Sequence, residues 1–598
     1  MGSETIEGAR SRAGGTAAKR SDGGITAPGA AAYGTTIKAT ATFTRGSTSS
    51  PSPVAPIYGG NLPTVANGRR VVDGLASIGA AGQTARQRMF GNRTMGATMN
   101  LADIGLHWAR WQPNEVAIRF GSRSVTWGEL DTRTSAIAAD LRARGVGVGD
   151  RIAILMLNRP EWIEATIAAW KVAAVVVPLN VRFTSAEVAY VVRDAGARIL
   201  LTDETLAPSC AMIDASVTVL TAGDIAAITV GDGEQVASAL TDDSTPSFLC
   251  YTSGTTGDPK GAILTHGSWN VASQGWAQAI ELTPKDRVVL PFPLAFTGGL
   301  AVFLFTYWAG ARLVLEPAVD TDRLFDLFEN ERVTALLSVP AILQQLVSHP
   351  RFAGADLSSW RVACSGGAPV PVPLIEAIQA IGVPMLQGFS LTEASAAATI
   401  LSNHEATRKI GSAGLPIIHG SIGIVDDDGL PVPVGTVGEI TVGGPQIMVG
   451  YWNKPEASAA ALANGVLHTG DLGYLDDEGY LFVVDRKKDM LISGGLNVYP
   501  AEIERVLVNV AGIVEVAVIG VPDERWGETP AVIAWTNGAA LDPSTILEAC
   551  TATLADFKLP RYVVSSPEPL PRNMSGKILK RELKLRYVDL PATATPIR

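Results

Sequence analysis

The sequence predicts an α/β fold, in which a large N-terminal domain of mixed α/β layers with covered sheets is followed by a small α+β C-terminal domain. Three observations predict it: the length of the chain, an alternation of strand-like and helix-like segments after residue 100, and a change of composition near residue 488. A chain of 598 residues with 47% hydrophobic residues exceeds what one core usually organises and can fill more than one. We therefore expect three regions, residues 1–98, 99–487 and 488–598.

Short apolar runs of strand length alternate with segments whose apolar residues recur at helical spacing in the first part of the second region. This alternation predicts βαβ units and a mostly parallel sheet that is covered on both faces. Thr184 and Glu187 form a capping box that begins one of the helices. The expected elements are a helix from Trp127 that ends at Gly145, a strand over 152–157, a helix over 162–170, a strand over 175–177 closed by Pro178, the capped helix, and a strand over 199–201.

The third region begins where the composition of the sequence changes. A charged patch over 486–489 is followed by a turn at Gly494 and Gly495 and by a helix expected to begin near Pro500. Alternating valines then predict a strand of a small α+β unit. These valines are Val514, Val516 and Val518.

Residues 1–98 differ from the rest of the chain. They are rich in Gly, Ala, Ser and Thr and hold eleven Lys and Arg against four acidic residues, a composition typical of disorder. An Arg-rich, acid-poor segment also suits an organelle transit peptide, but Glu4 and Glu7 stand early and no amphipathic helix is evident. We favour the alternative that Met99 is the natural start and that the preceding residues are an upstream extension.

Charge and cysteine content narrow the class of protein. The net charge of −10 and the pI near 5.3 argue against nucleic acid as a partner, because phosphate neutralisation needs clustered Lys and Arg. The four cysteines are far apart and form no Cys-x-x-Cys pair, so neither a disulfide framework nor a thiolate metal site is indicated. A cytoplasmic protein that acts on small molecules is the expectation.

One uncharged stretch, residues 288–311, has the length of a membrane-spanning helix. Pro291, Pro293 and the glycines at 298 and 299 break its first half. The uninterrupted part, residues 300–309, is too short to span a bilayer. We therefore expect a buried core helix and no transmembrane segment.

A phosphate-binding loop is indicated by residues 252–261, which read Thr-Ser-Gly-Thr-Thr-Gly-Asp-Pro-Lys-Gly after an apolar strand-like run. Glycines let backbone N–H groups converge on an anion, hydroxyls add donors, and Lys260 adds charge. The loop is not a Walker A motif, because Gly-Lys-Ser/Thr does not occur at the required spacing. The alternative is a polar, Gly-rich surface turn.

This loop resembles the signature of the acyl-adenylate-forming (AMP-binding) superfamily, which includes acyl-CoA synthetases, coumarate-CoA ligases, luciferases and the adenylation domains of peptide synthetases. The resemblance extends over nearly all of residues 100–585, because further family motifs follow in the family's order. They are Ser365-Gly366-Gly367-Ala368-Pro369, Gly388-Phe389-Ser390-Leu391-Thr392-Glu393, Thr469-Gly470-Asp471, residues 485–489, the stretch from Gly494-Gly495 to Glu504, and residues 571–577.

The resemblance implies ATP and Mg²⁺ as cofactors and coenzyme A as co-substrate. Activation of a carboxylate by AMP transfer brings two anions together, so positive charge must offset their repulsion. Glu393 would bind Mg²⁺ at the α-phosphate, with Thr256 as a second predicted metal ligand, and Thr392 would donate to the same phosphate. Lys577 would reach both the substrate carboxylate and the α-phosphate, and it is the residue we expect to drive adenylation.

The remaining nucleotide contacts are implied in the same way. Asp471 would accept both ribose hydroxyls, Arg486 would contact ribose or phosphate, and Phe389 would stack on adenine in place of the commoner Tyr. Lys488 matches a hinge about which the small domain rotates between adenylation and thioester formation, so this domain is expected to be mobile. The other predicted contacts are Thr252, Ser253, Gly254, Thr255, Thr256, Gly257 and Lys260 for phosphate, Gly366, Gly367, Ala368, Pro369 and Gly388 for adenine, and Gly494 and Gly495 for pantetheine.

The predicted acyl pocket departs from the family pattern. Phe296 stands where many relatives carry a histidine, and we predict that it contacts the substrate together with Thr297 and Gly299. Neighbouring apolar residues favour a fatty acid of medium or long chain, and an aromatic or alicyclic acid is the next hypothesis. No acidic residue stands between Asp286 and Glu316, which disfavours an amino acid.

Two further hypotheses compete with a CoA ligase. An adenylating enzyme can deliver its acyl group to a carrier protein, although the chain ends 21 residues after Lys577 without a carrier domain. An AMP-sensing or scaffold protein can keep the fold without catalysis, but binding alone does not need both Glu393 and Lys577. The expected partners are a small carboxylic acid, ATP and CoA.

Overall fold

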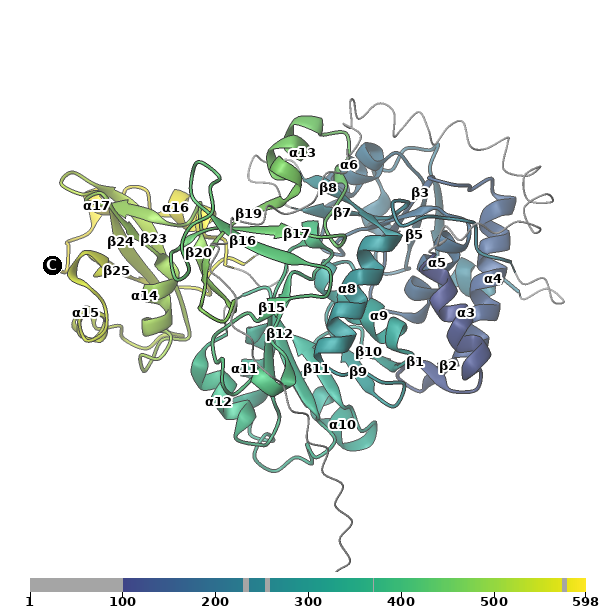
Figure 1. Ribbon diagram of the computed structural model, residues 1–598, viewed down its shortest axis with the longest axis horizontal. Helices are drawn as coiled ribbons and strands as arrows, with labels where there is room; N and C mark the ends of the chain where they lie inside the picture. Colours follow the sequence, from purple (N-terminus) through teal and green to yellow (C-terminus); the bar gives the residue numbers. More distant parts are fainter. Residues whose placement is uncertain (1–99, 230–235, 253–258, 369, 573–577) are drawn as a thin grey trace, which may run out of the picture. The chain divides into compact units, whose positions relative to one another are not determined.

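The computed structural model describes residues 100–598 except 230–235, 253–258, 369 and 573–577 (Figure 1). All of the described residues lie within one compact unit. The predictions made for residues 1–98 fall outside them. So do the predicted contacts Ser253, Gly254, Thr255, Thr256, Gly257, Pro369 and Lys577.

The first sheet is formed by seven strands in the order β18-β8-β7-β4-β3-β5-β6. The pairs from β7 to β6 are all parallel, whereas β8 is antiparallel to β7 and β18 is antiparallel to β8. This confirms the predicted βαβ units. The strands are β3 (Arg151–Leu155), β4 (Val175–Pro178), β5 (Ala197–Thr202), β6 (Thr218–Thr221), β7 (Pro246–Thr252), β8 (Lys260–Thr265) and β18 (Gly450–Tyr451).

The helices of this part follow the sequence signals closely. Thr184 and Glu187 make both hydrogen bonds of the predicted capping box, and Gly196 ends the same helix in the left-handed conformation at φ 62°. The helix predicted to end at Gly145 ends two residues earlier, and Gly145 takes a positive φ just beyond it. The helices are α3 (Ala102–Trp111), α4 (Trp127–Ala143), α5 (Pro160–Lys171), α6 (Ser185–Ala195), α7 (Ala222–Ala227) and α13 (Pro455–Ala461).

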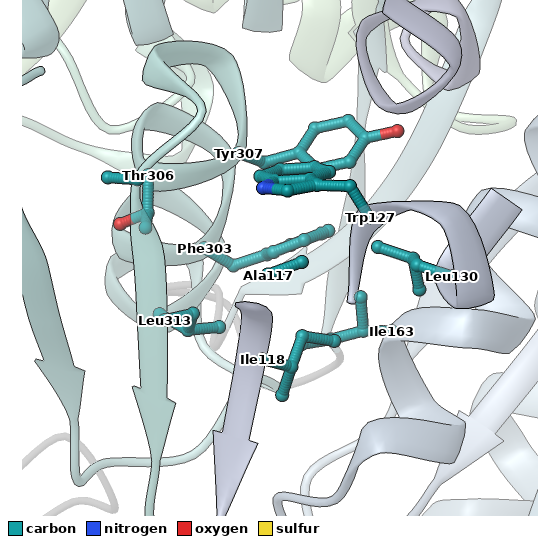
Figure 2. A pocket seen from close by; sticks show the side chains of 10 residues that line it. Ala117, Ile118, Trp127, Leu130, Ile163, Phe303, Thr306, Tyr307 and Leu313 are labelled. Atoms are coloured by element: carbon teal, nitrogen blue, oxygen red, sulfur yellow. The ribbon is translucent and has the colours of Figure 1, made fainter. Parts of the chain in front are cut away.

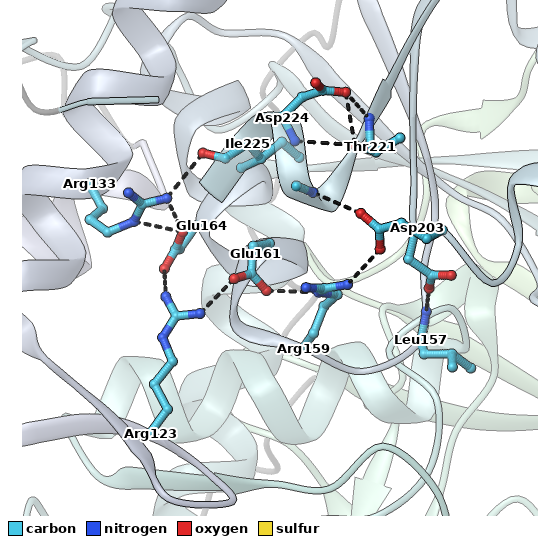
Figure 3. Close-up of polar contacts among 12 residues, drawn as sticks. Arg123, Arg133, Leu157, Arg159, Glu161, Glu164, Asp203, Thr221, Asp224 and Ile225 are labelled. Carbon is cyan, nitrogen blue, oxygen red and sulfur yellow. Dashed lines mark hydrogen bonds and ion pairs between the residues drawn. The ribbon is translucent and has the colours of Figure 1, made fainter. Parts of the chain in front are cut away.

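Helix α5 is buried along its whole length although it carries Glu161 and Glu164. Buried charges are costly unless they are paired. Arg123 bridges both carboxylates, Arg133 adds a second contact to Glu164 at 2.9 Å, and Arg159 contacts Glu161 at 2.8 Å (Figure 3). Each carboxylate therefore has two arginine partners, and this network offsets the buried charge of α5.

The second sheet has nine strands in the order β15-β14-β13-β12-β11-β9-β10-β1-β2, and its central strands are parallel. One face packs on helices α10, α11 and α12, and the other belongs to the largest core cluster, which includes α8 and α9. The strands are β1 (Val116–Phe120), β2 (Arg123–Thr126), β9 (Arg287–Leu290), β10 (Arg312–Leu315), β11 (Ala335–Ser338), β12 (Val362–Gly366), β13 (Met385–Phe389), β14 (Thr399–Ile400) and β15 (Leu415–Pro416). The helices are α8 (His266–Ala279), α9 (Thr297–Ala309), α10 (Thr321–Asn330), α11 (Pro340–Val347) and α12 (Val372–Gln379).

The uncharged stretch over 288–311 forms strand β9 and the predicted buried helix, α9. The prolines precede this helix as predicted, but Gly298 and Gly299, which were predicted to interrupt the stretch, lie in its first turn, so the helix begins at Thr297. Helix α9 packs beside α8 and is buried almost throughout. In the part of the chain that the structure describes, no helix has the length and apolarity needed to cross a membrane. A cavity of about 10 Å³ lies between Phe303 and Tyr307 of α9 and residues of β1, β10, α4 and α5 (Figure 2). A cavity of this size holds at most one water molecule, so it is a packing defect.

The last part of the chain contains two smaller sheets. One is an antiparallel sheet in the order β16-β17-β19-β20, and the other combines β22-β21-β24-β23 with β25 beside β24. The helix predicted near Pro500 begins there, and the strand predicted from Val514 begins one residue later. The strands are β16 (Ser421–Val425), β17 (Gly438–Gly443), β19 (Leu467–Leu475), β20 (Leu481–Arg486), β21 (Leu491–Ser493), β22 (Leu496–Val498), β23 (Glu515–Asp523), β24 (Gly527–Trp535) and β25 (Tyr562–Ser566). The helices are α14 (Pro500–Leu507), α15 (Pro543–Thr551), α16 (Lys580–Arg586) and α17 (Leu590–Thr593).

Candidate active site

The predicted phosphate loop joins two antiparallel strands, β7 and β8. Thr252 ends β7 and lies opposite Lys260, which begins β8, and the Thr252 hydroxyl donates to the Lys260 carbonyl at 3.4 Å. Gly261 is required next to this pair, because a Cβ there would lie 2.8 Å from Leu249 and 3.1 Å from the Tyr251 ring. The two strands that flank the loop are therefore closely packed, and Lys260 is the first residue of β8.

A short strand that the sequence does not predict, β18, pairs with β8. In β18, Tyr451 lies opposite Ala262 of β8, and the next residue, Trp452, donates its backbone N–H to the Gly261 carbonyl at 2.7 Å. The Trp452 indole also donates to the Asp194 carbonyl at 3.0 Å. A two-residue strand has no periodicity, so the aromatic pair itself was the available signal.

Thr392 and Glu393 lie in a single 3-10 turn (η3, Thr392–Ala394) that follows strand β13. The Thr392 hydroxyl is hydrogen-bonded to the Thr297 hydroxyl at 2.7 Å. Glu393 accepts twice from the segment around β18: the Tyr451 hydroxyl donates to its Oε1 at 2.8 Å, and the Met448 N–H donates to its carbonyl at 2.7 Å. The structure thus brings the predicted phosphate, metal and substrate residues together at the strand ends.

The chemistry of this site fits Mg²⁺, which prefers carboxylate oxygens combined with phosphate oxygens and water. None of the described cationic side chains pairs with Glu393, and none of the described residues donates a hydrogen bond to its Oε2. Burial, followed by the Glu393 charge, raises the pKa of the Tyr451 hydroxyl, so the phenol remains a donor. A bound Mg²⁺ would supply charge stabilisation, and Glu393 would be its ligand.

Another acidic group lies elsewhere in the described chain, in the turn at Asp476, Asp477 and Glu478. Lys409 contacts Asp476 at 2.7 Å and Glu478 at 2.6 Å, and Arg408 contacts Glu478 at 2.7 Å. These cations already offset the negative charge, which makes the turn a poor metal site.

The glycines predicted near adenine lie side by side on two parallel strands. Gly366 of β12 pairs with Gly388 of β13. A Cβ on Gly388 would approach Cη2 of Trp276 to 2.6 Å, and one on Gly366 would approach the Gly388 carbonyl to 3.1 Å, so a side chain at either position would displace a neighbour. Gly367 follows with a φ of 79°, and Ala368 is exposed. Phe389 packs into the core, and its side chain is only 8% exposed.

Asp471 and Arg486 lie opposite each other on β19 and β20. The two residues are paired in register, and Nε of Arg486 is 3.3 Å from Oδ1 of Asp471. Thr469 accepts from the Asp471 N–H at 3.1 Å and donates to the Ile440 carbonyl at 2.7 Å, which fixes the turn before the carboxylate. The two predicted ribose contacts are therefore adjacent in space.

Lys488 is exposed in the turn between β20 and β21. The turn is closed by N–H groups of Asp489 and Met490, which both donate to the Arg486 carbonyl. Gly494 and Gly495 form the two-residue hairpin between β21 and β22, with φ of 58° and 81°. Two positive φ values in succession are typical of a type I′ turn and explain both glycines.

The predicted acyl-side residues lie at the beginning of α9. Phe296 is the residue before the helix and is partly buried, and Thr297 is its first residue. Gly299 is needed because a Cβ there would lie 2.3 Å from the Pro293 carbonyl. Leu300 and Phe303 are buried in the main core, whereas Ala295 and Phe296 before the helix are only partly buried.

Two family profiles match the chain. The profile of the AMP-binding enzyme family matches residues 106–452, and that of the AMP-binding enzyme C-terminal domain matches residues 502–577. Among solved structures, o-succinylbenzoate CoA synthetase from Bacillus subtilis, in complex with ATP and magnesium ion, is similar with a TM-score of 0.74 and 31% identity. The match covers 80% of this chain and 99% of that chain.

Proteins of similar sequence are also named as CoA ligases or synthases. A long-chain-fatty-acid–CoA ligase of Mycobacterium tuberculosis is 38% identical over 479 residues, which are 77% of this chain and 93% of the relative. A feruloyl-CoA synthase of an Amycolatopsis species is 39% identical over 492 residues, which are 80% of this chain and 97% of the relative. The chain belongs to the AMP-binding enzyme family and is an AMP-forming acid–thiol ligase.

Proposed function

We propose that the chain uses ATP and Mg²⁺ to convert a medium- or long-chain fatty acid into an acyl-adenylate and then into an acyl-CoA thioester. The observation that carries this proposal is the 2.7 Å hydrogen bond between the Thr297 and Thr392 hydroxyls. Thr297 belongs to the predicted acyl side and Thr392 to the predicted phosphate side. Adenylation requires the carboxylate and the α-phosphate to meet, so contact between these two sides supports it.

Glu393 and Lys577 divide the electrostatic work in this proposal. Glu393 holds Mg²⁺ against the phosphates, and Lys577 reaches the carboxylate and the α-phosphate from the last part of the chain. Asp471 and Arg486 hold the ribose. We further propose that residues 488–598 move as one domain about Lys488, so that Lys577 leaves the site before the CoA thiol enters.

A fatty acid is supported by the apolar character of the acyl-side segment. Phe296 replaces a polar residue at the beginning of α9, and no acidic side chain is available in that segment to hold an ammonium group. The relative from Mycobacterium tuberculosis is named as a ligase for long-chain fatty acids. A planar aromatic acid is the second candidate, because the feruloyl-CoA synthase is equally similar.

A substrate panel tests the proposal. Purified protein is incubated with ATP, Mg²⁺ and CoA together with saturated fatty acids of increasing length, ferulate, indoleacetate, 2-succinylbenzoate or amino acids, while pyrophosphate release and CoA consumption are followed. We expect the highest kcat/KM with a fatty acid of medium or long chain. A preference for ferulate would favour an aromatic acid over a fatty acid as the substrate. Activity only with an amino acid would overturn both substrate assignments.

The acceptor is tested separately. Adenylate formed in the absence of CoA is offered either CoA or a phosphopantetheinyl carrier protein, and the thioester is detected by mass spectrometry. We expect transfer to CoA. Transfer to the carrier alone would contradict the assignment of CoA as the acceptor.

A further inference from the structure

Tyr451 contacts two residues of opposite charge, the predicted phosphate contact Lys260 and the predicted Mg²⁺ ligand Glu393. Its hydroxyl donates to Oε1 of Glu393 at 2.8 Å, and the ammonium of Lys260 lies 5.6 Å from the centre of its ring. The first contact is a hydrogen bond to an acceptor, and the second is a cation–π contact. One phenol therefore lies against the predicted metal ligand and the predicted phosphate lysine at the same time.

Lys260 and Glu393 both contact Tyr451 but form no ion pair with each other. Among the residues that the structure describes, no ion pair joins them to each other or to another charged side chain. Opposite charges attract strongly at contact distance in a partly buried site. A direct pair would neutralise both groups and would compete with ATP and Mg²⁺ for them.

The backbone around Tyr451 fixes the position of the phenol. Its N–H donates to the Ser458 hydroxyl at 2.8 Å, and the Trp452 N–H donates to the Gly261 carbonyl at 2.7 Å. The Met448 N–H contacts the Glu393 backbone as well. These bonds fix the backbone of Tyr451 next to that of Glu393, and the hydrogen bond between the phenol and the carboxylate holds the ring against both charges.

We propose that Tyr451 is a positioning residue that separates Lys260 from Glu393 and orients the Glu393 carboxylate. Both charges then stay available, one for the phosphates of ATP and the other for Mg²⁺. The proposal rests on the proposed function. Tyr451 itself transfers no proton and contacts no reacting atom.

The test measures binding of a non-hydrolysable ATP analogue by calorimetry, with and without Mg²⁺, and binding of Mn²⁺ to the protein–analogue complex by electron paramagnetic resonance. Tyr451→Phe keeps the ring and removes the donor, and Tyr451→Leu removes both. The matched control is Tyr474→Phe. Tyr474 of β19 stacks on Phe482 of β20 and is not among the residues proposed to bind ATP or Mg²⁺. Thermal unfolding of each variant is recorded in parallel.

We expect Tyr451→Phe to weaken Mn²⁺ binding about tenfold and to leave the metal-free affinity for the analogue unchanged, because only the orientation of Glu393 is lost. Tyr451→Leu should also lower the metal-free affinity, because Lys260 becomes free to pair with Glu393. The control should match the wild type. Equal Mn²⁺ binding by Tyr451→Phe and the wild type would overturn the proposal.

A double-mutant cycle distinguishes an effect that acts through Glu393 from a general structural effect of the Tyr451 substitution. In a Glu393→Gln background, Tyr451→Phe should no longer change Mn²⁺ binding, because the residue through which it acts is gone. An undiminished effect in that background would contradict the proposed route. A wild-type protein that binds no analogue under any condition would overturn the proposed function, whereas normal wild-type binding with unaltered variants overturns the role of Tyr451 alone.

Discussion

Glu393 and Asp471 are both carboxylates that are predicted to face ATP, and the protein holds them differently. Glu393 accepts a hydrogen bond from the neutral Tyr451 hydroxyl at 2.8 Å. Asp471 lies 3.3 Å from the Arg486 guanidinium. A hydroxyl leaves the charge of a carboxylate whole, whereas a guanidinium offsets most of it.

The difference corresponds to the two tasks proposed for these carboxylates. A metal ligand must offer its negative charge to a cation, so a neutral donor on one oxygen orients it without weakening it. A group that accepts hydrogen bonds from ribose hydroxyls needs lone pairs more than net charge. The arginine beside it also offsets the negative charge that the Asp471 carboxylate would otherwise place near the phosphates. The way in which each carboxylate is held thus indicates the kind of ligand that it takes.

Substitution of Glu393 should have the largest effect. Glu393→Gln keeps an oxygen for the Tyr451 hydroxyl but removes the charge, and we expect adenylation to slow about 100-fold or more, the order seen when one group that stabilises transition-state charge is removed. Pyrophosphate exchange measures this step without CoA. The unfolding temperature should stay within a few degrees of the wild type, and an active variant would show that Glu393 is not the metal ligand.

Asp471→Asn should have a smaller and more selective effect. We expect about tenfold weaker ATP binding, because hydrogen bonds to a charged acceptor are lost, with little change in the rate of adenylation at saturating ATP. Comparison of ATP with 2′-deoxy-ATP checks the assignment. The wild type should discriminate between them and the variant should not. If the variant still discriminates between ATP and 2′-deoxy-ATP, Asp471 does not bind the ribose, and the comparison with Glu393 does not hold.

Thr297→Val asks whether the hydroxyl network around Glu393 reaches the acyl side. The change is nearly isosteric and removes the hydrogen bond to Thr392, so we expect kcat/KM for the acid to fall about fivefold while ATP binding is unchanged. Thr321→Val is the matched control, since Thr321 begins α10 as Thr297 begins α9. Equal losses in both variants would mean that the hydroxyl acts only on helix stability.

Much of the fold follows from local signals in the sequence. The spacing of apolar residues predicts the alternation of strands and helices between Arg151 and Thr202. The capping box at Thr184 predicts the first residue of a helix correctly. The glycines at 494 and 495 predict their hairpin because few other residues adopt two positive φ values in succession. These features depend on neighbouring residues only.

The composition of the site was less predictable. Motif resemblance provided Thr392, Glu393 and Asp471, but the Glu393 contact Tyr451 lies in a strand of two residues that pairs with β8 across almost two hundred positions. Such a contact depends on tertiary packing and leaves no periodic trace. Phe389 as an adenine contact stays a prediction, since burial of the residue to 8% exposure does not decide what its exposed edge contacts.

A fully neutral contact extends the comparison, and its effect should be on stability at acid pH rather than on catalysis near neutral pH. His266 is buried at the beginning of α8, and its Nδ1 accepts from the Leu101 N–H at 3.1 Å, which requires the unprotonated ring. Burial lowers the pKa of His266 to about 3 from an ordinary value near 6.5. The unfolded chain therefore binds a proton below pH 6.5 that the folded chain does not, so stability should fall as the pH drops from 6.5 towards 3.

The expected slope for this one group approaches about 1.4 kcal/mol per pH unit well below pH 6.5, and it vanishes above that pH. Chemical denaturation of the wild type and of His266→Gln at a series of pH values measures it, and the difference between the two profiles isolates the histidine. We expect the profiles to converge in slope above pH 6.5 and to diverge below it, with the wild type losing stability faster. Parallel profiles throughout would mean that His266 is already protonated in the folded state and that its contact with Leu101 is not the neutral one.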